Sequence, residues 1–416
     1  MTSTNWAGNL AFAAAAPHEP TSIPELQRLV ARSRSLRALG SRHSFNAIAD
    51  GAEQVSVARL ARELVIDAEA STVTVSAGAR YGDFVEQLDA AGWALHNLAS
   101  LPHISVAGAI STGTHGSGDV NGSLATAVSA IEFVAADGTL LTMSRSDPEF
   151  AGMVVSLGMI GVLTRVTLDI QPTFLMRQDV FERLPWSVVY DGLDAITSSA
   201  YSVSQFTRWG PEGVTQAWLK SRMDAVGPAV SSGALPGGTR ADRPLHPLPG
   251  GPASTTTEQG GLAGPWWNRL PHFRLEFTPS NGEELQTEYL VPRENVLEAL
   301  DAVRALAPRF VEHLFVSELR TVAADDLWLS PSHGTGCVGI HFTWLRNVPE
   351  VRGILPALDD ALNPLGGRPH WGKLFETDPA RLAALYPRMD DFRALVTRLD
   401  PSGTFRNRAV TEWLGL

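Results

Sequence analysis

The sequence predicts an α+β fold in which short helices are mixed with antiparallel strand pairs. Apolar and polar residues alternate in many short runs, and turn signals rather than regularly spaced helices separate these runs. No G-x-G-x-x-G follows a predicted strand, which argues against a doubly wound Rossmann domain. The 416 residues are 44% hydrophobic and 19% charged, so a large core is available and two or three domains are expected.

Two helix starts in the first quarter of the chain carry the pattern of a capping box. Ser22 precedes a run with helical apolar spacing, and Glu25 follows three residues later as the return partner. Asp83 and Glu86 repeat the pattern, and we expect this second helix to close at Gly92.

Strands and a hairpin are expected in the same region. "LRALG" is typical of a short buried strand that ends at Gly40, and "STVTVSAGARYGDF" of a strand with Val73 and Val75 on one face. Apolar runs on both sides of the D-G pair at 137–138 predict a hairpin. "MIGVLTRVTLDIQP" predicts a further strand that Pro172 ends.

The character of the sequence changes after Gln171. Residues 226–264 are dense in Pro, Gly, Ser and Thr, which predicts a long surface excursion. The other elements expected here are strands at 174–184 and 216–224, a helix at 292–308, strands at 313–326 and 336–346, a helix at 351–367, and a tail at 378–410 that is helical and then extended.

Charge and cysteine content narrow the possible partners and compartment. The net charge of −11 argues against general binding to nucleic acid or to an anionic membrane, because both favour basic surfaces. Cys337 is the single cysteine, so no intramolecular disulfide forms, which fits a reducing compartment. The first 20 residues lack the pattern of a secretory signal, and no run approaches the ~20 apolar residues of a membrane helix. We expect a cytoplasmic protein.

Two glycine-bearing stretches indicate a place where a ligand approaches the backbone closely. In "LHNLASLPHISVAGAISTGTHGSG" (residues 95–118), glycines are interleaved with serines and threonines, a composition that favours an anion cradle. Its apolar centre suits a dinucleotide that is half-buried, although a glycine-rich turn between core strands has the same composition. "GSRHSFN" places His43 just after a second Gly-Ser turn.

Charged and polar residues two apart mark one face of two predicted strands. Glu318 and Arg320 share a strand face, as do His341 and Thr343. An inward ion pair is costly unless it is well hydrogen-bonded or functional, and the alternative is a surface ion pair. His341 alone is more typical of a core histidine whose hydrogen bonds are satisfied.

Two other kinds of site are disfavoured. His103 and His115 are twelve residues apart with no acidic partner nearby, which is a poor metal-ligand set, so we expect no metal. No G-x-S-x-G elbow is present, which argues against a hydrolase.

Six motifs together resemble one group of flavoproteins. "TNWAGN", "GSRHSFN", "ASLPHISVAGAISTGTHGSG", "ELRTVAADDLWLSP", "HFTW" and "RPHWGK" resemble, in order and spacing, the bacterial alditol (xylitol) oxidases of the vanillyl-alcohol oxidase family of FAD proteins. The resemblance covers nearly the whole chain. It implies a two-domain FAD-binding fold of the vanillyl-alcohol oxidase type with an antiparallel-sheet substrate domain. Residues 1–172, completed by 374–416, would bind FAD, and residues 173–373 would bind the substrate.

The resemblance also implies the cofactor site. His43 matches a histidine that bonds covalently to a flavin methyl group, and neutral imidazole is chemically able to attack such a carbon. Arg42 departs from the small residue expected there, and Ala99 leaves room for oxygen at the flavin edge, which favours an oxidase. Asn407 belongs to a C-terminal return over the flavin. The residues implied to contact FAD are Leu39, Gly40, Ser41, Arg42, His43, Ser44, Ser100, Ser105, Gly108, Thr112, Gly113, Thr114, His115, Ile160 and Val162.

The implied reaction is oxidation of a terminal hydroxyl of an alditol such as xylitol or sorbitol to the aldose, with molecular oxygen reduced to hydrogen peroxide. Lys373 or His341 would be the base, and the sequence does not choose between them. A monomer is expected. The residues implied to bind the polyol are Ser100, Glu318, Arg320, Thr343 and Lys373.

Two alternatives stay open. An aldonolactone oxidoreductase of the L-gulono-1,4-lactone type would share the fold, the Glu-x-Arg pair and an "HW-x-K" ending. "HWGK" and the fuller match at "TVAADDLWLSP" favour alditols. The second alternative is a non-catalytic sugar- or nucleotide-binding protein on the same scaffold.

Overall fold

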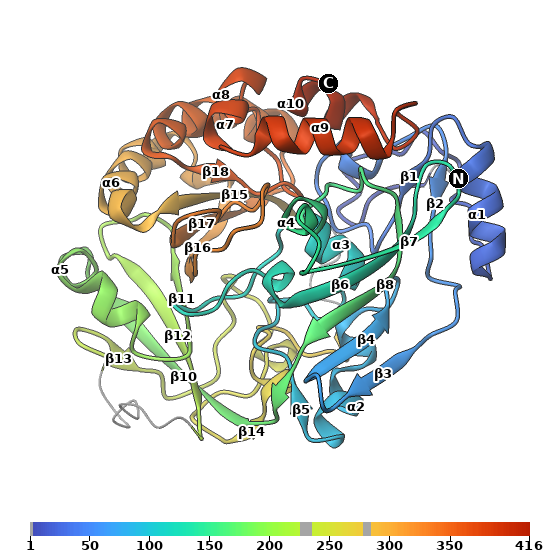
Figure 1. Cartoon of the computed structure of the whole chain (residues 1–416). Helices are drawn as coiled ribbons and strands as arrows, with labels where there is room; N and C mark the ends of the chain where they lie inside the picture. The colour runs from blue at the N-terminus through green and yellow to red at the C-terminus, as the bar shows by residue number, and fades with distance from the viewer. Residues whose placement is uncertain (1–2, 225–234, 278–283) are drawn as a thin grey trace.

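Two large antiparallel sheets lie beside each other in the computed structural model, which describes residues 3–224, 235–277 and 284–416 (Figure 1). Within these residues, five strands form one sheet in the order β3-β4-β8-β6-β7, and nine form the other in the order β13-β10-β12-β11-β16-β17-β15-β18 with β14 beside β10. The predicted α+β fold is confirmed. The sheets lie on opposite sides of residue 172 in the sequence, and the domain division at that residue stays a prediction.

The bounds of the elements follow the chain. The strands are β1 Arg37–Ala38, β2 Gln54–Val55, β3 Leu64–Asp67, β4 Thr72–Ser76, β5 Trp93–Ala94, β6 Val128–Val134, β7 Leu140–Ser144, β8 Val162–Asp169, β9 Gln171–Pro172, β10 Leu175–Leu184, β11 Ser202–Thr207, β12 Val214–Arg222, β13 Thr239–Arg240, β14 Gly264–Pro265, β15 Glu284–Pro292, β16 Leu314–Val322, β17 Cys337–Leu345 and β18 Arg368–Pro369. The α-helices are α1 Ile23–Arg32, α2 Val85–Ala90, α3 Val106–Ser111, α4 Phe150–Met153, α5 Trp186–Thr197, α6 Val296–Leu306, α7 Val348–Leu362, α8 Pro379–Leu385, α9 Met389–Leu399 and α10 Arg408–Leu414.

The smaller sheet follows the alternation in the sequence. Val73 and Val75 of β4 are both fully buried, and β6 and β7 form the predicted hairpin. Its turn needs Gly138, whose φ of +85° lies in the left-handed region. The strand predicted to end at Pro172 is divided in the structure. β8 ends at Asp169, and Pro172 lies in a separate short strand, β9, which pairs with β5.

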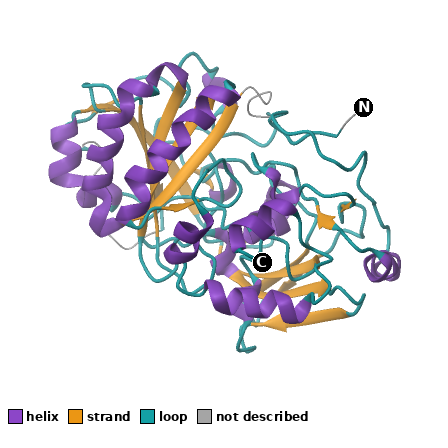
Figure 2. Cartoon of the chain, turned by 90° about the horizontal axis from the view of Figure 1, so that it is seen from above, coloured by secondary structure: helices purple, strands orange, loops and turns teal. Residues whose placement is uncertain are grey.

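The register of the larger sheet brings charged residues from distant parts of the chain into one row. Glu288 of β15 and Glu318 of β16 both pair with His341 of β17. Because paired residues on neighbouring strands lie on the same face, the three side chains share one side of the sheet. Leu319 and Ile340 point to the other side, into an apolar core that α5, α6 and α7 complete. Figure 2 shows helices along one face of this sheet.

Two details of the predicted capping boxes are wrong. Ser22 does cap α1, but the Glu25 carboxylate accepts the N–H of Thr21 rather than that of Ser22. Asp83 accepts the Arg80 N–H and thereby caps a preceding turn, so α2 begins only at Val85. Gly92 closes that helix as predicted.

The tail and the region after residue 171 also differ from expectation. The tail ends in α10 rather than in extended chain, because the Asn407 side chain accepts the Val410 N–H and caps a new helix. Of the predicted excursion at 226–264, residues 226–234 lie outside the described residues, and the rest holds β13 and β14. The helix α5 and the strands β11 and β15 were not predicted.

Residues from the two ends of the chain meet beside the smaller sheet. The guanidinium of Arg37, a buried cation, donates to the carbonyl of Phe405, and the Asn407 amide donates to the carbonyls of Ala47 and Asp50 at 2.8 and 2.7 Å. The segment around Arg37 is therefore held by the C-terminal tail.

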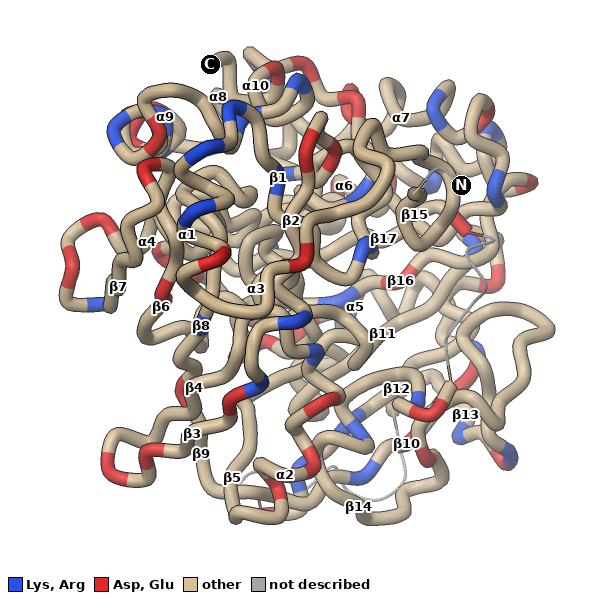
Figure 3. The backbone as a smooth tube through the Cα atoms, turned by 90° about the vertical axis from the view of Figure 1, so that its right-hand side faces the viewer, with Lys and Arg blue, Asp and Glu red and all other residues tan. Residues whose placement is uncertain are grey.

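The surface is mixed in charge. Acidic and basic residues are interspersed over the side of the molecule that Figure 3 shows. None of the helices in the described ranges has the combined length and apolar character that crossing a bilayer requires.

Candidate active site

A cavity of about 600 Å³ lies between the two sheets. Its lining combines residues from segments 37–58, 77–80, 99–115, 156–163, 246–255, 284–288, 316–320, 341–343 and 370–373. The cofactor residues and the polyol residues expected from the sequence therefore face one space, with the exceptions of Gly113 and Ile160. Gly113 packs against Pro331, and Ile160 is fully buried in the core.

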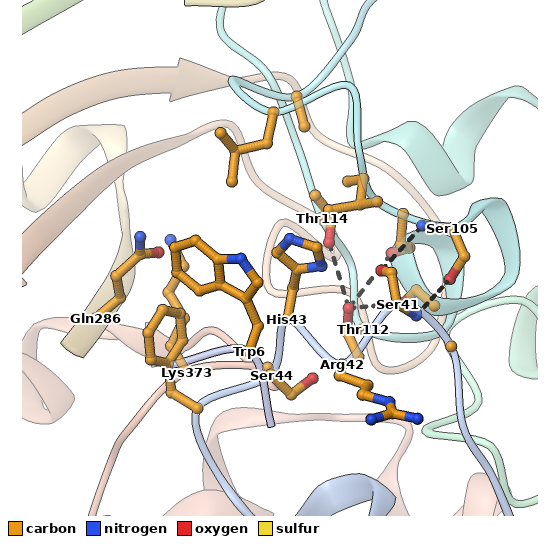
Figure 4. A pocket seen from close by; sticks show the side chains of 18 of the residues that line it. Trp6, Ser41, Arg42, His43, Ser44, Ser105, Thr112, Thr114, Gln286 and Lys373 are labelled. Carbon is orange, nitrogen blue, oxygen red and sulfur yellow. Dashed lines mark hydrogen bonds between the residues drawn. The ribbon is translucent and has the colours of Figure 1, made fainter. Parts of the chain in front are cut away.

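Two segments form a continuous cradle on one side of this cavity. The Ser41 N–H donates to Ser105 Oγ at 3.3 Å, and the Ser105 N–H donates to Ser41 Oγ at 3.1 Å (Figure 4). Gly40 is required here, because an added Cβ would lie 2.5 Å from Ser105 Oγ. The apolar centre of the glycine-rich stretch is the helix α3 rather than a loop, and Thr112 and Thr114 follow it with their hydroxyls 3.3 Å apart.

Arg42 lies in the same turn with a φ of +65°. Glycine adopts such a left-handed backbone most readily, so an arginine is unusual at this position. The side chain is exposed, its guanidinium donates to Ser3 Oγ at 3.3 Å, and it points away from the His43 ring in Figure 4.

His43 lines the cavity with its ring stacked on Trp6, the ring centroids being 5.3 Å apart. Its Nδ1 is buried and has no hydrogen-bond partner among the described residues. Burial, followed by the nearby His103 and Arg80, lowers the pKa of His43 to about 4. The imidazole is therefore neutral at neutral pH and keeps a nucleophilic lone pair.

Glu288 organises the opposite side of the cavity. Its side chain is fully buried, with Oε2 2.5 Å from Lys373 Nζ and Oε1 2.8 Å from an Arg320 nitrogen and 3.3 Å from His115 Nε2. Burial alone would raise the pKa of Glu288, but Lys373, His115 and Arg320 outweigh it and hold the pKa well below its usual range. One carboxylate thus places two cationic side chains and an imidazole around the cavity.

Lys373 and His341 form a contact pair next to this carboxylate. Lys373 Nζ lies 2.8 Å from His341 Nδ1, and His341 Nε2 lies 3.1 Å from Thr343 Oγ1. Burial, then the charge of Lys373, lowers the pKa of His341 well below its usual range, so its ring is neutral. Both ring nitrogens of His341 therefore have partners. Burial lowers the pKa of Lys373, although the charge of Glu288 opposes this effect.

Glu318 and Arg320 share a strand face, as the sequence predicts. Glu318 Oε1 accepts a hydrogen bond from His272 Nε2 at 2.7 Å and lies 3.6 Å from Arg320 Nε. Arg320 in turn donates to Ser100 Oγ at 3.4 Å. Burial would raise the pKa of Glu318, but Arg320 and His272 hold it below its usual range, so the group is a carboxylate.

The sequence reasoning missed Glu288, His272 and Lys220, which contacts His272. The signal for Glu288 lies in "EELQTEYLVP", where charged or amide side chains at 284, 286 and 288 alternate with the buried Leu285, Thr287 and Tyr289. Such a strand has one polar face, and here that face lines the cavity.

The residues present fit a flavin dinucleotide. The cavity has the size of cofactor pockets, Gly40 lets two lining segments pack closely at Ser105, and the buried Nδ1 of His43 has no hydrogen-bond partner among the described residues. Ala99, which is buried and small, also lines this space.

Comparisons with known proteins agree with this geometry. An FAD binding domain family model matches residues 13–144, and a D-arabinono-1,4-lactone oxidase model matches residues 281–414. The chain is 46% identical to an alditol oxidase from Streptomyces sp. over 99% of this chain and 98% of the relative. It is 30% identical to an L-gulono-1,4-lactone dehydrogenase from Mycobacterium tuberculosis over 99% of both chains.

The solved structure of a solvent-stable cholesterol oxidase is similar with a TM-score of 0.77 and 17% identity, covering 100% of this chain and 97% of the other. At this identity the likeness concerns the fold. Together with the FAD binding domain match, it confirms the predicted FAD-binding fold of the vanillyl-alcohol oxidase type.

We expect Glu288→Gln to destabilise the protein by about 3 kcal/mol at pH 7, because it leaves buried cations without their counter-charge. The pKa of Glu288 is depressed from its ordinary value of 4.5, so its stabilisation is complete above that value and is lost as the pH falls through the folded-state pKa. Denaturant unfolding of both proteins at pH 7 and pH 4 measures this difference, which should be smaller at pH 4.

The matched control is Glu312→Gln, which changes an exposed glutamate and should alter stability by no more than about 0.5 kcal/mol. An equal difference between wild type and Glu288→Gln at both pH values would contradict the assignment.

Proposed function

The chain belongs to the alditol oxidase family of FAD-dependent oxidoreductases, and from this premise we propose that it oxidises the terminal hydroxyl of alditols such as xylitol and sorbitol to the aldose, with oxygen reduced to hydrogen peroxide. The observation that carries the proposal is that the predicted polyol residues and the predicted flavin cradle line the same cavity.

The polar residues of β16, β17 and the segment after β18 suit a chain of hydroxyls. Each hydroxyl both donates and accepts, and the cavity offers the Glu318 carboxylate as acceptor, the charged Arg320 as donor and the Lys373 amino group as a further polar contact. Ser100 and Thr343 supply further hydroxyls. These five residues are the proposed polyol site.

The cradle around Ser41, Ser105 and Thr112 would hold FAD, as would most other residues that the sequence implies for it. When bound, FAD supplies the acceptor for a hydride from the substrate carbon and passes both electrons to oxygen. Ala99 would leave space for oxygen beside it. We also propose that the protein works in the cytoplasm as a monomer; the single, buried Cys337 is compatible with that reducing compartment.

His43 is proposed to carry a covalent bond to a flavin methyl carbon. The neutral ring, its stacking on Trp6 and its buried, unpartnered Nδ1 support this proposal. Such a bond would join an imidazole nitrogen to the methyl carbon, and the two protons and two electrons released would reach oxygen as hydrogen peroxide.

Lys373 is proposed as the base that takes the hydroxyl proton. Both nitrogens of the alternative, His341, contact other side chains, and a lysine whose pKa is lowered by burial is a suitable base. His341 would then align the lysine, with Glu288 stabilising the protonated form.

Substrate turnover tests the proposed reaction. We expect the purified yellow protein to release hydrogen peroxide with xylitol or sorbitol and to be much slower with L-gulono-1,4-lactone, measured with a peroxidase-coupled assay. Preference for the lactone would favour the alternative function of an aldonolactone oxidoreductase. The match of residues 281–414 to the D-arabinono-1,4-lactone oxidase model is compatible with that alternative. A colourless protein that forms no peroxide with either substrate would indicate a binding protein.

Acid precipitation tests the covalent bond. We expect the yellow colour to stay in the pellet of the wild-type protein and to pass to the supernatant for His43→Ala. His103→Ala is the control: within the described ranges His103 hydrogen-bonds only with the Leu275 carbonyl, and its variant should keep the coloured pellet. Colour that leaves the wild-type pellet would disprove the tether.

Anaerobic flavin reduction tests the base. With xylitol, Lys373→Met should slow reduction at least about 100-fold, the lower range for loss of a general base, and His341→Gln should slow it less. The wild-type rate should rise with pH as the lysine loses its proton, and Lys373→Met should lack this rise, both followed by stopped-flow absorbance. Normal reduction in both variants would overturn the assignment.

A further inference from the structure

The chain contains only two lysines, Lys220 and Lys373, among 33 basic residues. Lys373 lines the cavity, whereas Lys220 on β12 does not. Lys220 is 1% exposed, and no carboxylate forms an ion pair with it in the described part of the chain. A buried lysine without a direct counter-ion is costly, so its contacts require a reason.

Burial lowers the pKa of Lys220 to about 7, but three acceptors surround its Nζ and favour the ammonium form. Nζ donates to the carbonyl of Leu270 and, at 3.0 Å, to that of Pro271, and it lies 3.0 Å from His272 Nδ1. A tetrahedral ammonium has three donors, and all three are used here. Arginine has a planar fork of donors and does not match this arrangement, which fits the use of lysine in a chain that otherwise prefers arginine.

The contacts of His272 determine where its proton resides. Glu318 is a carboxylate and only accepts, so His272 Nε2, 2.7 Å from its Oε1, must carry the hydrogen. Nδ1 of the neutral ring is then an acceptor, and Lys220 donates to it. The hydrogen bonds therefore run in one direction, from Lys220 through His272 to Glu318.

Neighbouring side chains hold the His272 ring in the orientation that these hydrogen bonds require. Trp218 and Phe206 pack edge-on against it, with centroids 5.3 and 5.7 Å away, and Ser204 Oγ lies 3.4 Å from Nε2. Oε1 of Glu318 is thus fixed by His272. Oε2 has no hydrogen-bond partner among the described residues, and Glu318 lines the cavity.

We infer that Lys220 is a positioning residue for the substrate: through His272 it fixes the Glu318 carboxylate so that Oε2 accepts a hydrogen bond from a polyol hydroxyl. The inference rests on the proposed function, because it assumes that Glu318 binds the polyol. Lys220 itself touches neither substrate nor cofactor.

A double-mutant cycle on the FAD-loaded enzyme tests the inference. Lys220→Met should raise KM for xylitol about 10-fold, the range for a hydrogen bond to a charged group, with a smaller change in kcat. In a Glu318→Gln background, Lys220→Met should change KM by less than about 2-fold, because its effect passes through Glu318. Independent, multiplicative effects of the two substitutions would overturn the inference.

A pair of His272 variants keeps the inference testable if Lys220→Met does not fold. His272→Gln retains an N–H near the Nε2 position and should raise KM less than about 3-fold, whereas His272→Leu should raise it about 10-fold. Ser317→Ala is the control. Ser317 lies on the same strand as Glu318 but on the face away from the cavity, and its buried Oγ accepts a hydrogen bond from Trp209 Nε1, which the substitution removes. Equal KM values for the two His272 variants would contradict the inference.

A measurement without substrate separates this inference from the proposed function. Nitrogen NMR of histidine-labelled protein should show His272 protonated at Nε2 in the wild type and a changed protonation pattern in Lys220→Met, with His272→Gln identifying its signals. If the tautomer is as expected but no polyol is oxidised, the proposed function fails and the Lys220–His272–Glu318 contact stands. Nδ1 protonation in the wild type would overturn the inference itself.

Discussion

The arrangement of the active site depends on a single carboxylate that water does not reach. Glu288 contacts Lys373 and Arg320, which would otherwise repel each other across a small space, and it also lies beside His115. In a buried environment the ionised form of this group persists only because these partners surround it. Lys373, Arg320 and His115 come from three separate segments, and each is positioned by its contact with Glu288. The geometry of the cavity therefore depends on all four side chains together.

The larger sheet places Glu288 and its charged neighbours on one face, which lines the cavity. Its register places Glu288, His341 and Glu318 side by side, while the apolar residues between them pack against helices. A strand with a period of two can satisfy a core on one face and present charges on the other. The polar face meets the cradle of Ser41 and Ser105, so a cofactor and a substrate would face each other across the cavity.

The sequence predicted those parts of the fold and site that local patterns encode. The alternation at Val73 and Val75, the hairpin at residues 137–138 and the shared face of Glu318 and Arg320 depend on neighbours along the chain, and all are present. Asp83 was misassigned because either of two adjacent turns could use its carboxylate, and backbone geometry alone decides between them. Glu288 was missed because its burial depends on partners 32 and 85 residues away, which no local pattern records. The cofactor residues were predicted through a resemblance, because composition alone also allowed a plain glycine-rich turn.

The contacts between the two ends of the chain have a consequence for biosynthesis. Arg37 and the turn at residues 47–50 belong to the segment that includes the cradle proposed for FAD, yet they are held by Phe405 and Asn407. During translation, Arg37 and residues 47–50 leave the exit tunnel of the ribosome long before Phe405 and Asn407 do. Domains that fold early during translation would therefore contain an incomplete cradle, and stable cofactor loading would have to wait until residues 405–407 have left the exit tunnel.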